Sequence, residues 1–171
     1  MKKKYELLVL LSGPEPQRTV FENILLSQLK SFNGSVVLVR GLPGSTEQLI
    51  PDNKNIIVHN HLPAGSLNEL MQFSSNIIAR CGYSSIMDLA VLGQNAILVP
   101  TPGQTEQEYL AEYLMEKKLF FTCSQENFSL QQALESARHF ESSGFSGIQE
   151  IKKDIIVTCI ERLKKNITVL Q

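Results

Sequence analysis

Two segments of this chain put small and polar residues where an apolar run meets a helix start. The first covers residues 78–88. Its apolar beginning is typical of a buried strand, Gly82 permits a tight turn, and Ser84 and Ser85 are favoured where a helix starts. Because a helix N-terminus carries unsatisfied N–H donors and a partial positive charge, this turn predicts a site for a phosphate or diphosphate. Asp88, about one helical turn further on, could accept hydrogen bonds from ribose hydroxyls.

The same serine and carboxylate also fit a structural pattern. In a capping box, a Ser or Thr side chain accepts from the third N–H of a helix, and an acidic or Gln side chain three positions later folds back to the cap. Capping and nucleotide binding are therefore both open at this turn. Pairs with this spacing, each predicting a helix start, are Thr19 with Glu22, Ser66 with Glu69, Ser85 with Asp88, Thr105 with Glu108, and Ser129 with Gln132.

The second segment covers residues 96–111 and repeats the arrangement of strand, Pro/Gly loop and helix. Thr105 and Glu108 form a possible capping box here. Gln104 and Gln107 place amide groups beside the expected helix start. An amide offers both a donor and an acceptor without a charge to desolvate, which suits sugar hydroxyls. The segment therefore predicts contacts to a sugar.

Short apolar strands that alternate with helices must hold these segments. Their Val, Ile and Leu runs do not alternate with polar residues, which indicates strands buried on both faces. The expected strands are residues 5–11, 35–39, 56–59, 76–80, 96–99 and 120–122. The fold class is therefore α/β, a doubly wound parallel sheet of about six strands with ligands at the carboxyl ends of the strands. We expect the first helix to end at Asn33-Gly34 and a last amphipathic helix to run through residues 151–163.

Length and composition fit one domain spanning residues 1–171. With 16 basic and 17 acidic residues the net charge is −1, which provides no basic surplus for binding nucleic acid or an anionic membrane. No apolar run approaches the ~18 residues of a membrane span. The three cysteines, Cys81, Cys123 and Cys159, lack CxxC or His spacing. We therefore expect no disulfide, no metal site, no membrane insertion and a cytoplasmic location.

Taken together, the two segments resemble the nucleotide-sugar-binding half of GT-B glycosyltransferases. The likeness is strongest to the family that adds N-acetylglucosamine to the lipid-linked peptidoglycan precursor, and it is densest across residues 78–114. Matching positions are Arg80-Cys81-Gly82, Ser85, Asp88, Gly93, Pro100, Gln107 and Tyr109. The resemblance implies a Rossmann-like C-terminal domain that binds a UDP-sugar.

The resemblance also implies roles for individual residues. In such enzymes the residue like Ser85 lies by the phosphates, the acid like Asp88 holds the ribose, and the glutamine like Gln107 contacts the donor sugar. The turn after the third strand lies along the nucleobase, so His59 and Leu62 are expected to border uracil.

The chain departs from the family pattern at several positions. Asp88 replaces a glutamate, Glu108 a glutamine and Ala111 an asparagine. The family's first phosphate loop is rich in glycine, whereas residues 11–18 contain two prolines and one glycine, Gly13. Arg18 in this loop fits either bidentate phosphate binding or an ordinary surface arginine. The full set of expected nucleotide-sugar-binding residues is Ser12, Gly13, Arg18, His59, Leu62, Arg80, Gly82, Tyr83, Ser84, Ser85, Asp88, Gln104, Thr105 and Gln107.

The implied function is donor binding in a UDP-sugar-dependent transferase of hexosyl groups, with UDP-N-acetylglucosamine as the expected donor. Such enzymes need a second Rossmann-like half for the acceptor and the general base, and no catalytic residue is assigned in this chain. We therefore expect a C-terminal domain without its N-terminal acceptor domain, inactive alone, peripheral to the inner membrane in the complete enzyme, and independent of a metal or other cofactor. The alternatives are a small cytosolic subunit that needs a partner chain, a non-catalytic nucleotide-sugar-binding module, or a UDP-sugar 2-epimerase.

Overall fold

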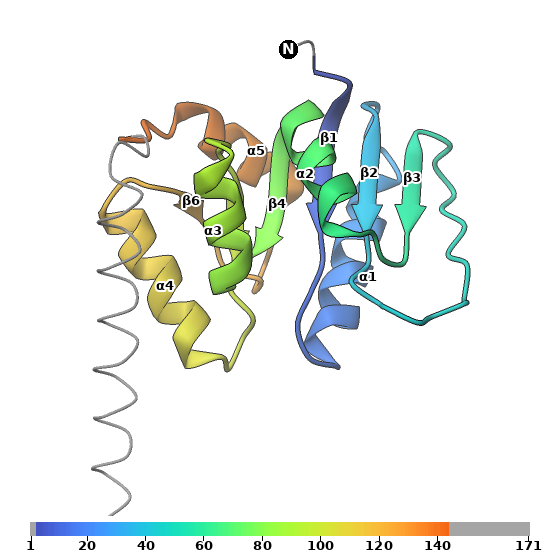
Figure 1. Cartoon of the computed structure of the whole chain (residues 1–171), viewed down its shortest axis with the longest axis horizontal. Coiled ribbons are helices and arrows are strands. Elements are labelled where there is room, and N and C mark those ends of the chain that lie inside the picture. Colours follow the sequence, from blue (N-terminus) through green and yellow to red (C-terminus); the bar gives the residue numbers. More distant parts are fainter. Residues whose placement is uncertain (1–2, 144–171) are drawn as a thin grey trace, which may run out of the picture.

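A parallel sheet with helices packed on both faces forms the molecule (Figure 1). The computed structural model describes residues 3–143. In chain order the elements are β1 (Tyr5–Leu10), α1 (Gln17–Leu29), β2 (Val36–Val39), β3 (Ile56–His59), α2 (Ala64–Phe73), β4 (Ser74–Arg80), α3 (Tyr83–Val91), β5 (Ile97–Val99), α4 (Thr105–Glu116), β6 (Phe121–Thr122) and α5 (Leu130–His139). The expected α/β fold with six strands is confirmed.

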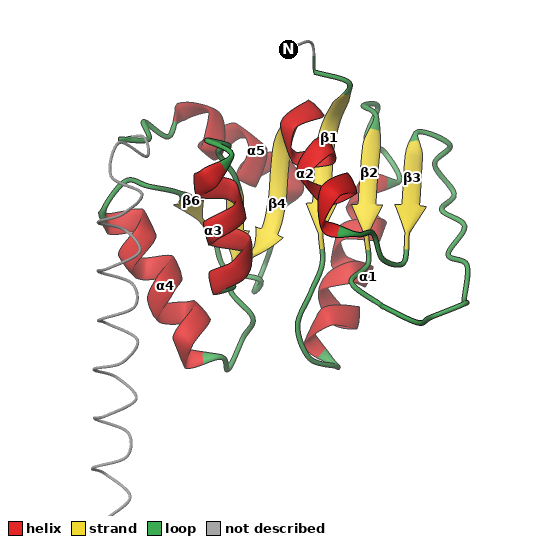
Figure 2. Ribbon diagram, in the orientation of Figure 1, coloured by secondary structure: helices red, strands yellow, loops and turns green. Residues whose placement is uncertain are grey.

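The six strands are arranged in the order β3-β2-β1-β4-β5-β6, and every neighbouring pair is parallel. β1 lies at the centre, where Leu7 is aligned with Val36 on one side and with Asn76 on the other. All strands therefore end at one edge of the sheet, as the aligned arrowheads of β1 to β4 show (Figure 2). The loops that follow the strands gather along this edge.

Two apolar clusters hold the helices against the sheet. On one face, α1 and α5 pack on the sheet through side chains such as Phe21 and Leu130. On the other face, α2, α3 and α4 pack through residues such as Met71, Ile86 and Leu114. Strand residues are buried on both faces because a doubly wound sheet has no solvent-facing side, which explains their continuous apolar sequence.

Four of the five expected capping boxes are wrong. The first residues of α1, α2, α3 and α4 follow Pro16, Pro63, Gly82 and Gln104, and none of these four N-cap residues makes a side-chain cap hydrogen bond. Three of the helices begin two residues before the expected Ser or Thr, and α4 begins at Thr105 itself. At α5 the expectation is confirmed, because the Ser129 side chain accepts from the N–H of Gln132. Helix α1 also ends earlier than expected, at Leu29, and the expected helix at residues 151–163 lies outside the described residues.

Candidate functional site

The central feature of the site is the point between β1 and β4 where the direction of winding reverses. Strands to one side of β1 follow it directly in sequence, whereas β4 comes about seventy residues later and is its other neighbour. In open α/β sheets this point leaves a crevice outside the carboxyl ends of the strands, and ligands bind there. The loops after β1, β4 and β5 lie at this edge, and these loops together with the helices that follow them contain most of the residues expected from the sequence.

The start of α3 lies at this edge of the sheet. Gly82 is the N-cap in extended conformation, with φ −90° and ψ 145°, and no side chain caps it. Ser85 lies inside the helix as its third residue, and the Asp88 side chain is exposed. The structural alternative of a capping box at these two residues is therefore wrong. The first N–H groups of α3 and the Asp88 carboxylate remain available for a ligand.

The start of α4 is held by its own side chains. The Oε1 atom of Gln107 accepts a hydrogen bond from the N–H of Thr101 at 3.0 Å, and its Nε2 donates to Gln104 Oε1. The carboxylate of Glu108 accepts from the N–H of Gly103 at 2.9 Å. Each amide atom of Gln107 still has one free hydrogen-bonding position, since an amide offers two donors and an oxygen with two lone pairs. These contacts place Gln104 and Gln107 together beside the loop after β5.

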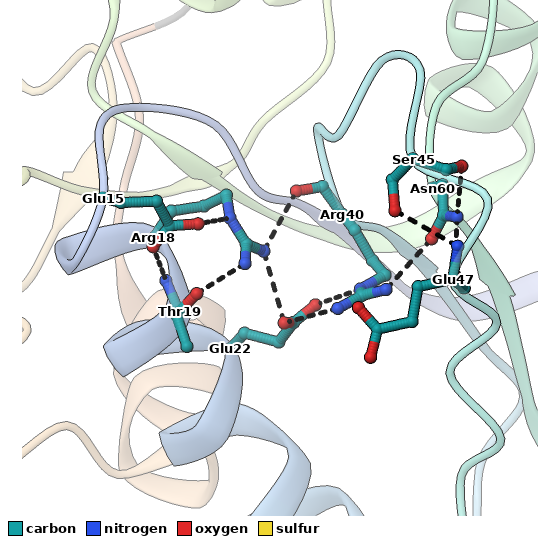
Figure 3. A network of polar contacts seen from close by, with 8 residues as sticks. All are labelled: Glu15, Arg18, Thr19, Glu22, Arg40, Ser45, Glu47 and Asn60. Atoms are coloured by element: carbon teal, nitrogen blue, oxygen red, sulfur yellow. Dashed lines mark hydrogen bonds and ion pairs between the residues drawn. The ribbon is translucent and has the colours of Figure 1, made fainter.

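The β1–α1 loop differs most from what the sequence suggested. Arg18 is 4% exposed, so the expected surface arginine is wrong. Its Nε atom lies 2.6 Å from Glu15 Oε1 and its Nη1 atom 3.2 Å from Glu22 Oε2 (Figure 3). Glu15 also accepts from the N–H of Thr19 at 3.1 Å. The hydrogen bond from Arg18 is the largest cause that holds the pKa of Glu15 below its usual value. A carboxylate of the chain therefore occupies the start of α1, and Arg18 is already engaged.

A buried ionic network that the sequence reading missed extends from this loop. Glu22 receives two hydrogen bonds from Arg40, at 2.6 and 3.1 Å, and Arg40 also donates to Asn60 (Figure 3). The Asn60 amide then donates to the carbonyls of Ser45 and Glu47. The signal in the sequence was a Glu within an apolar helix face and an Arg directly after an apolar strand. The network ties the loops after β1, β2 and β3 into one wall.

Arg80, the last residue of β4, points into the protein and not toward solvent. It is 1% exposed, its guanidinium carbon lies 4.4 Å from the centre of the Phe21 ring, and its Nη2 donates to the carbonyl of Gln17 at 2.9 Å. Its Nη1 lies 3.3 Å from the carbonyl of Pro100. Burial lowers the pKa of Arg80 to about 10. Direct contact with a ligand, as expected from the sequence, is not available to this side chain in the described conformation.

The other expected residues lie at the same edge of the sheet with different exposures. Ser12 and Gly13 are exposed in the loop after β1, and Gly13 has φ +103°. A Cβ atom on Gly13 would lie 3.5 Å from Thr101 Oγ1, so the loops after β1 and β5 approach each other here. His59 ends β3 half-buried, and Leu62 is partly buried against the core. The remaining expected residues are Tyr83, partly buried against the same core, Ser84, exposed in the first turn of α3, and Thr105, exposed at the start of α4.

The cysteines and acidic residues of the described part contribute no further site. Cys81 and Cys123 are free thiols, and burial raises their pKa values to about 12 and about 11. Residues 3–143 contain no group of three or more His, Cys, Asp and Glu side chains suited to a metal ion. None of the helices in this part of the chain is long and apolar enough to cross a membrane.

Comparison with known proteins adds a family and a fold. The family model of the glycosyltransferase family 28 C-terminal domain matches residues 23–162. Comparison with curated proteins gives no significant match. Among solved structures, the spinosyn forosaminyltransferase SpnP is similar over 95% of this chain and 44% of its own, with 17% identity and a TM-score of 0.58.

Two further structures set the scale of the similarity. MurG of Acinetobacter baumannii matches 80% of this chain and 41% of its own, with 17% identity and a TM-score of 0.58. ALG13 matches 85% of this chain and 91% of its own, with 14% identity and a TM-score of 0.59. This chain therefore spans less than half of SpnP and MurG, but nearly all of ALG13.

Proposed function

Since the chain belongs to the family of glycosyltransferase family 28 C-terminal domains, we propose that it binds the nucleotide-sugar donor of a UDP-sugar-dependent hexosyltransferase. The observation that carries the proposal is the uncapped start of α3 at the switch point between β1 and β4, with Asp88 exposed one turn further on. A diphosphate fits such a helix start because N–H donors and the helix dipole meet it there. The helix start proposed to bind the diphosphate therefore lies at the kind of position where open α/β sheets bind their ligands.

The proposed roles follow the positions of the residues along this edge. The N–H groups after Gly82 bind the diphosphate, assisted by the Ser84 and Ser85 hydroxyls. Asp88 accepts from the ribose hydroxyls. Gln104 and Gln107 use their remaining amide positions for the sugar, for which N-acetylglucosamine is the proposed identity.

The remaining contacts follow the loops on either side. His59 and Leu62 border the base, while Ser12 and Gly13 approach the phosphates from the loop after β1. Arg18 acts by holding that loop, because its own donors are already used by Glu15, Glu22, Thr19 and the carbonyl of Arg40. The proposed site contains no metal, since N–H donors take the place of a cation.

Transfer itself requires a second component. SpnP and MurG are more than twice as long as the part that this chain matches. We also assign no general base among the described residues. We therefore propose that this domain acts together with an acceptor-binding domain or partner chain and is inactive alone. The similarity to ALG13 over 91% of its length favours a separate small subunit as the second candidate arrangement.

Calorimetric titration with UDP, GDP and ADP tests the proposal directly. We expect UDP to bind with a dissociation constant of about tens of micromolar to millimolar, because a single domain provides only part of the cleft. GDP and ADP should bind more weakly, and a chelator should leave the UDP affinity unchanged. Equal affinity for the three nucleotides, or loss of UDP binding on chelation, would contradict the proposed site.

A further inference from the structure

Arg80 carries a positive charge that nothing in the described chain neutralises. The other two buried arginines, Arg18 and Arg40, both pair with the carboxylate of Glu22. Within residues 3–143 no ion pair reaches Arg80, whose polar contacts are main-chain carbonyls and whose flat face lies on Phe21. A buried charge without a counter-charge is costly. An anionic ligand nearby would offset that cost.

The contacts of Arg80 place this charge between the start of α1 and the end of β5, at the switch point of the sheet. Its Nη2 binds the carbonyl of Gln17, the first residue of α1, and its Nη1 binds the carbonyl of Pro100, after the end of β5. Gly82, the N-cap of α3, is two residues further along the chain. The guanidinium therefore lies beneath the loops that would surround a bound diphosphate.

Polar atoms left without partners mark the same position. Arg80 Nε, Thr101 Oγ1 and Gln125 Oε1 are buried with no hydrogen-bond partner in the described structure. Gln125 donates to the side chain of Gln17, and Thr101 lies against Gly13. Arg80 Nε belongs to the guanidinium itself, while Gln125 and Thr101 are linked to Arg80 through Gln17 and Pro100, whose carbonyls accept from Arg80. Buried polar atoms normally have hydrogen-bond partners, so these three free atoms indicate a region that can accept further polar contacts.

The hydrogen bonds of Arg80 alone do not require a cation. A neutral amide group could donate to carbonyl oxygens at the start of α1 and the end of β5, without the cost of burying a charge. The described contacts of Arg80 therefore do not account for its positive charge.

We propose that Arg80 is a positioning residue that supplies, from behind the loops, the counter-charge that makes this site prefer a diphosphate to an uncharged nucleoside. It acts through its electrostatic field at this edge of the sheet, without touching the ligand. The inference rests on the proposed function and deepens it. Because this charge is buried and weakly screened, it should act strongly on an anion several ångströms away.

A series of ligands that differ in charge tests the inference on the whole chain. Calorimetry gives the affinities of uridine, UMP and UDP for the natural protein and for Arg80→Met, Arg80→Lys and Arg138→Met. The last variant is the matched control, since it removes an arginine whose side chain is 69% exposed and lies away from the crevice. We expect Arg80→Met to reduce the ratio of UDP to uridine affinity by roughly ten- to a hundredfold, as removal of one nearby charge predicts. Uridine affinity should change less than about twofold.

The lysine variant keeps the charge but loses the planar fork, so it separates charge from hydrogen bonding. We expect its ratio of UDP to uridine affinity to stay within about threefold of the natural protein, even if both affinities fall. If Arg80→Met fails to fold, this ratio in Arg80→Lys still decides the question. A parallel fall of uridine and UDP in Arg80→Met, an unchanged ratio there, or a collapsed ratio in Arg80→Lys would overturn the inference. Absence of UDP binding to the natural protein would instead refute the proposed function.

Discussion

Replacing Glu22 with glutamine should be among the most damaging single changes to the stability of this domain. The Glu22 side chain is 4% exposed and meets Arg40 at 2.6 and 3.1 Å and Arg18 at 3.2 Å. Glutamine has nearly the same shape but no charge, so two buried guanidinium groups would lose their shared partner. Breaking a buried pair in this way costs about 3 to 5 kcal/mol. For a chain of this size, that corresponds to a fall in melting temperature of roughly 6 to 20 °C.

Urea and thermal unfolding of Glu22→Gln measure this loss. The matched control is Asp52→Asn, which also neutralises a paired carboxylate, but in an ion pair with Lys30 whose side chains are 65% and 76% exposed. Exposed pairs contribute less than about 1 kcal/mol, so this control should change the free energy of unfolding little. A loss for Glu22→Gln no larger than that of the control would refute the argument that Glu22 holds two buried charges together.

Three further predictions concern the binding site and a buried thiol. Asp88→Ala should weaken UDP binding about ten- to a hundredfold, and Asp88→Asn less, with the melting temperature unchanged because Asp88 caps nothing; a lower melting temperature with unchanged calorimetric affinity would contradict the ribose contact. Gln107→Ala should reduce the affinity for UDP-sugars more than for UDP, and it should cost about 1 kcal/mol in urea unfolding because the Thr101 N–H loses its partner; equal losses for UDP and every UDP-sugar would move Gln107 to the diphosphate. Cys81, fully buried with its pKa raised to about 12, should stay unlabelled by iodoacetamide at pH 8 until the protein unfolds, as judged by mass spectrometry; rapid labelling of the folded protein would show that this region opens.

The strands could be predicted well from the sequence because strands buried on both faces are short, continuous apolar runs. Five strands begin and end within one residue of the expected positions, and β4 begins two residues earlier than expected, at Ser74. The helix starts were less predictable, because a Ser or Thr three positions before an acid has the same spacing inside a helix as at its cap. The helices that follow Pro63 and Gly82 begin two residues before the serines that were expected to mark their starts.

The sequence predicted which residues lie at the carboxyl edge of the sheet, but not the direction of their side chains. Arg18 and Arg80 are polar residues next to loops, and a sequence gives no means of telling whether such side chains turn outward to a ligand or inward to the core. Their orientation also depends on residues further along the chain, such as Arg40, whose carbonyl accepts from Arg18, and Pro100, whose carbonyl accepts from Arg80. Those pairings arise only once the sheet has brought the strand ends together.

The position of β1 between β2 and β4 sets an order of events during synthesis of the chain. Residues of β1 can pair with β2 as soon as residue 39 is available, but their other partners lie in residues 74–79. Until β4 has been made, the nascent chain presents one unpaired apolar edge at its centre, a state that favours unwanted association with other chains. The crevice between β1 and β4 comes into existence at the same moment as this edge is closed. The proposed ligand contacts in α3 and at the start of α4 follow β4 in the sequence. A ligand bound there would therefore stabilise only chains that have passed this step.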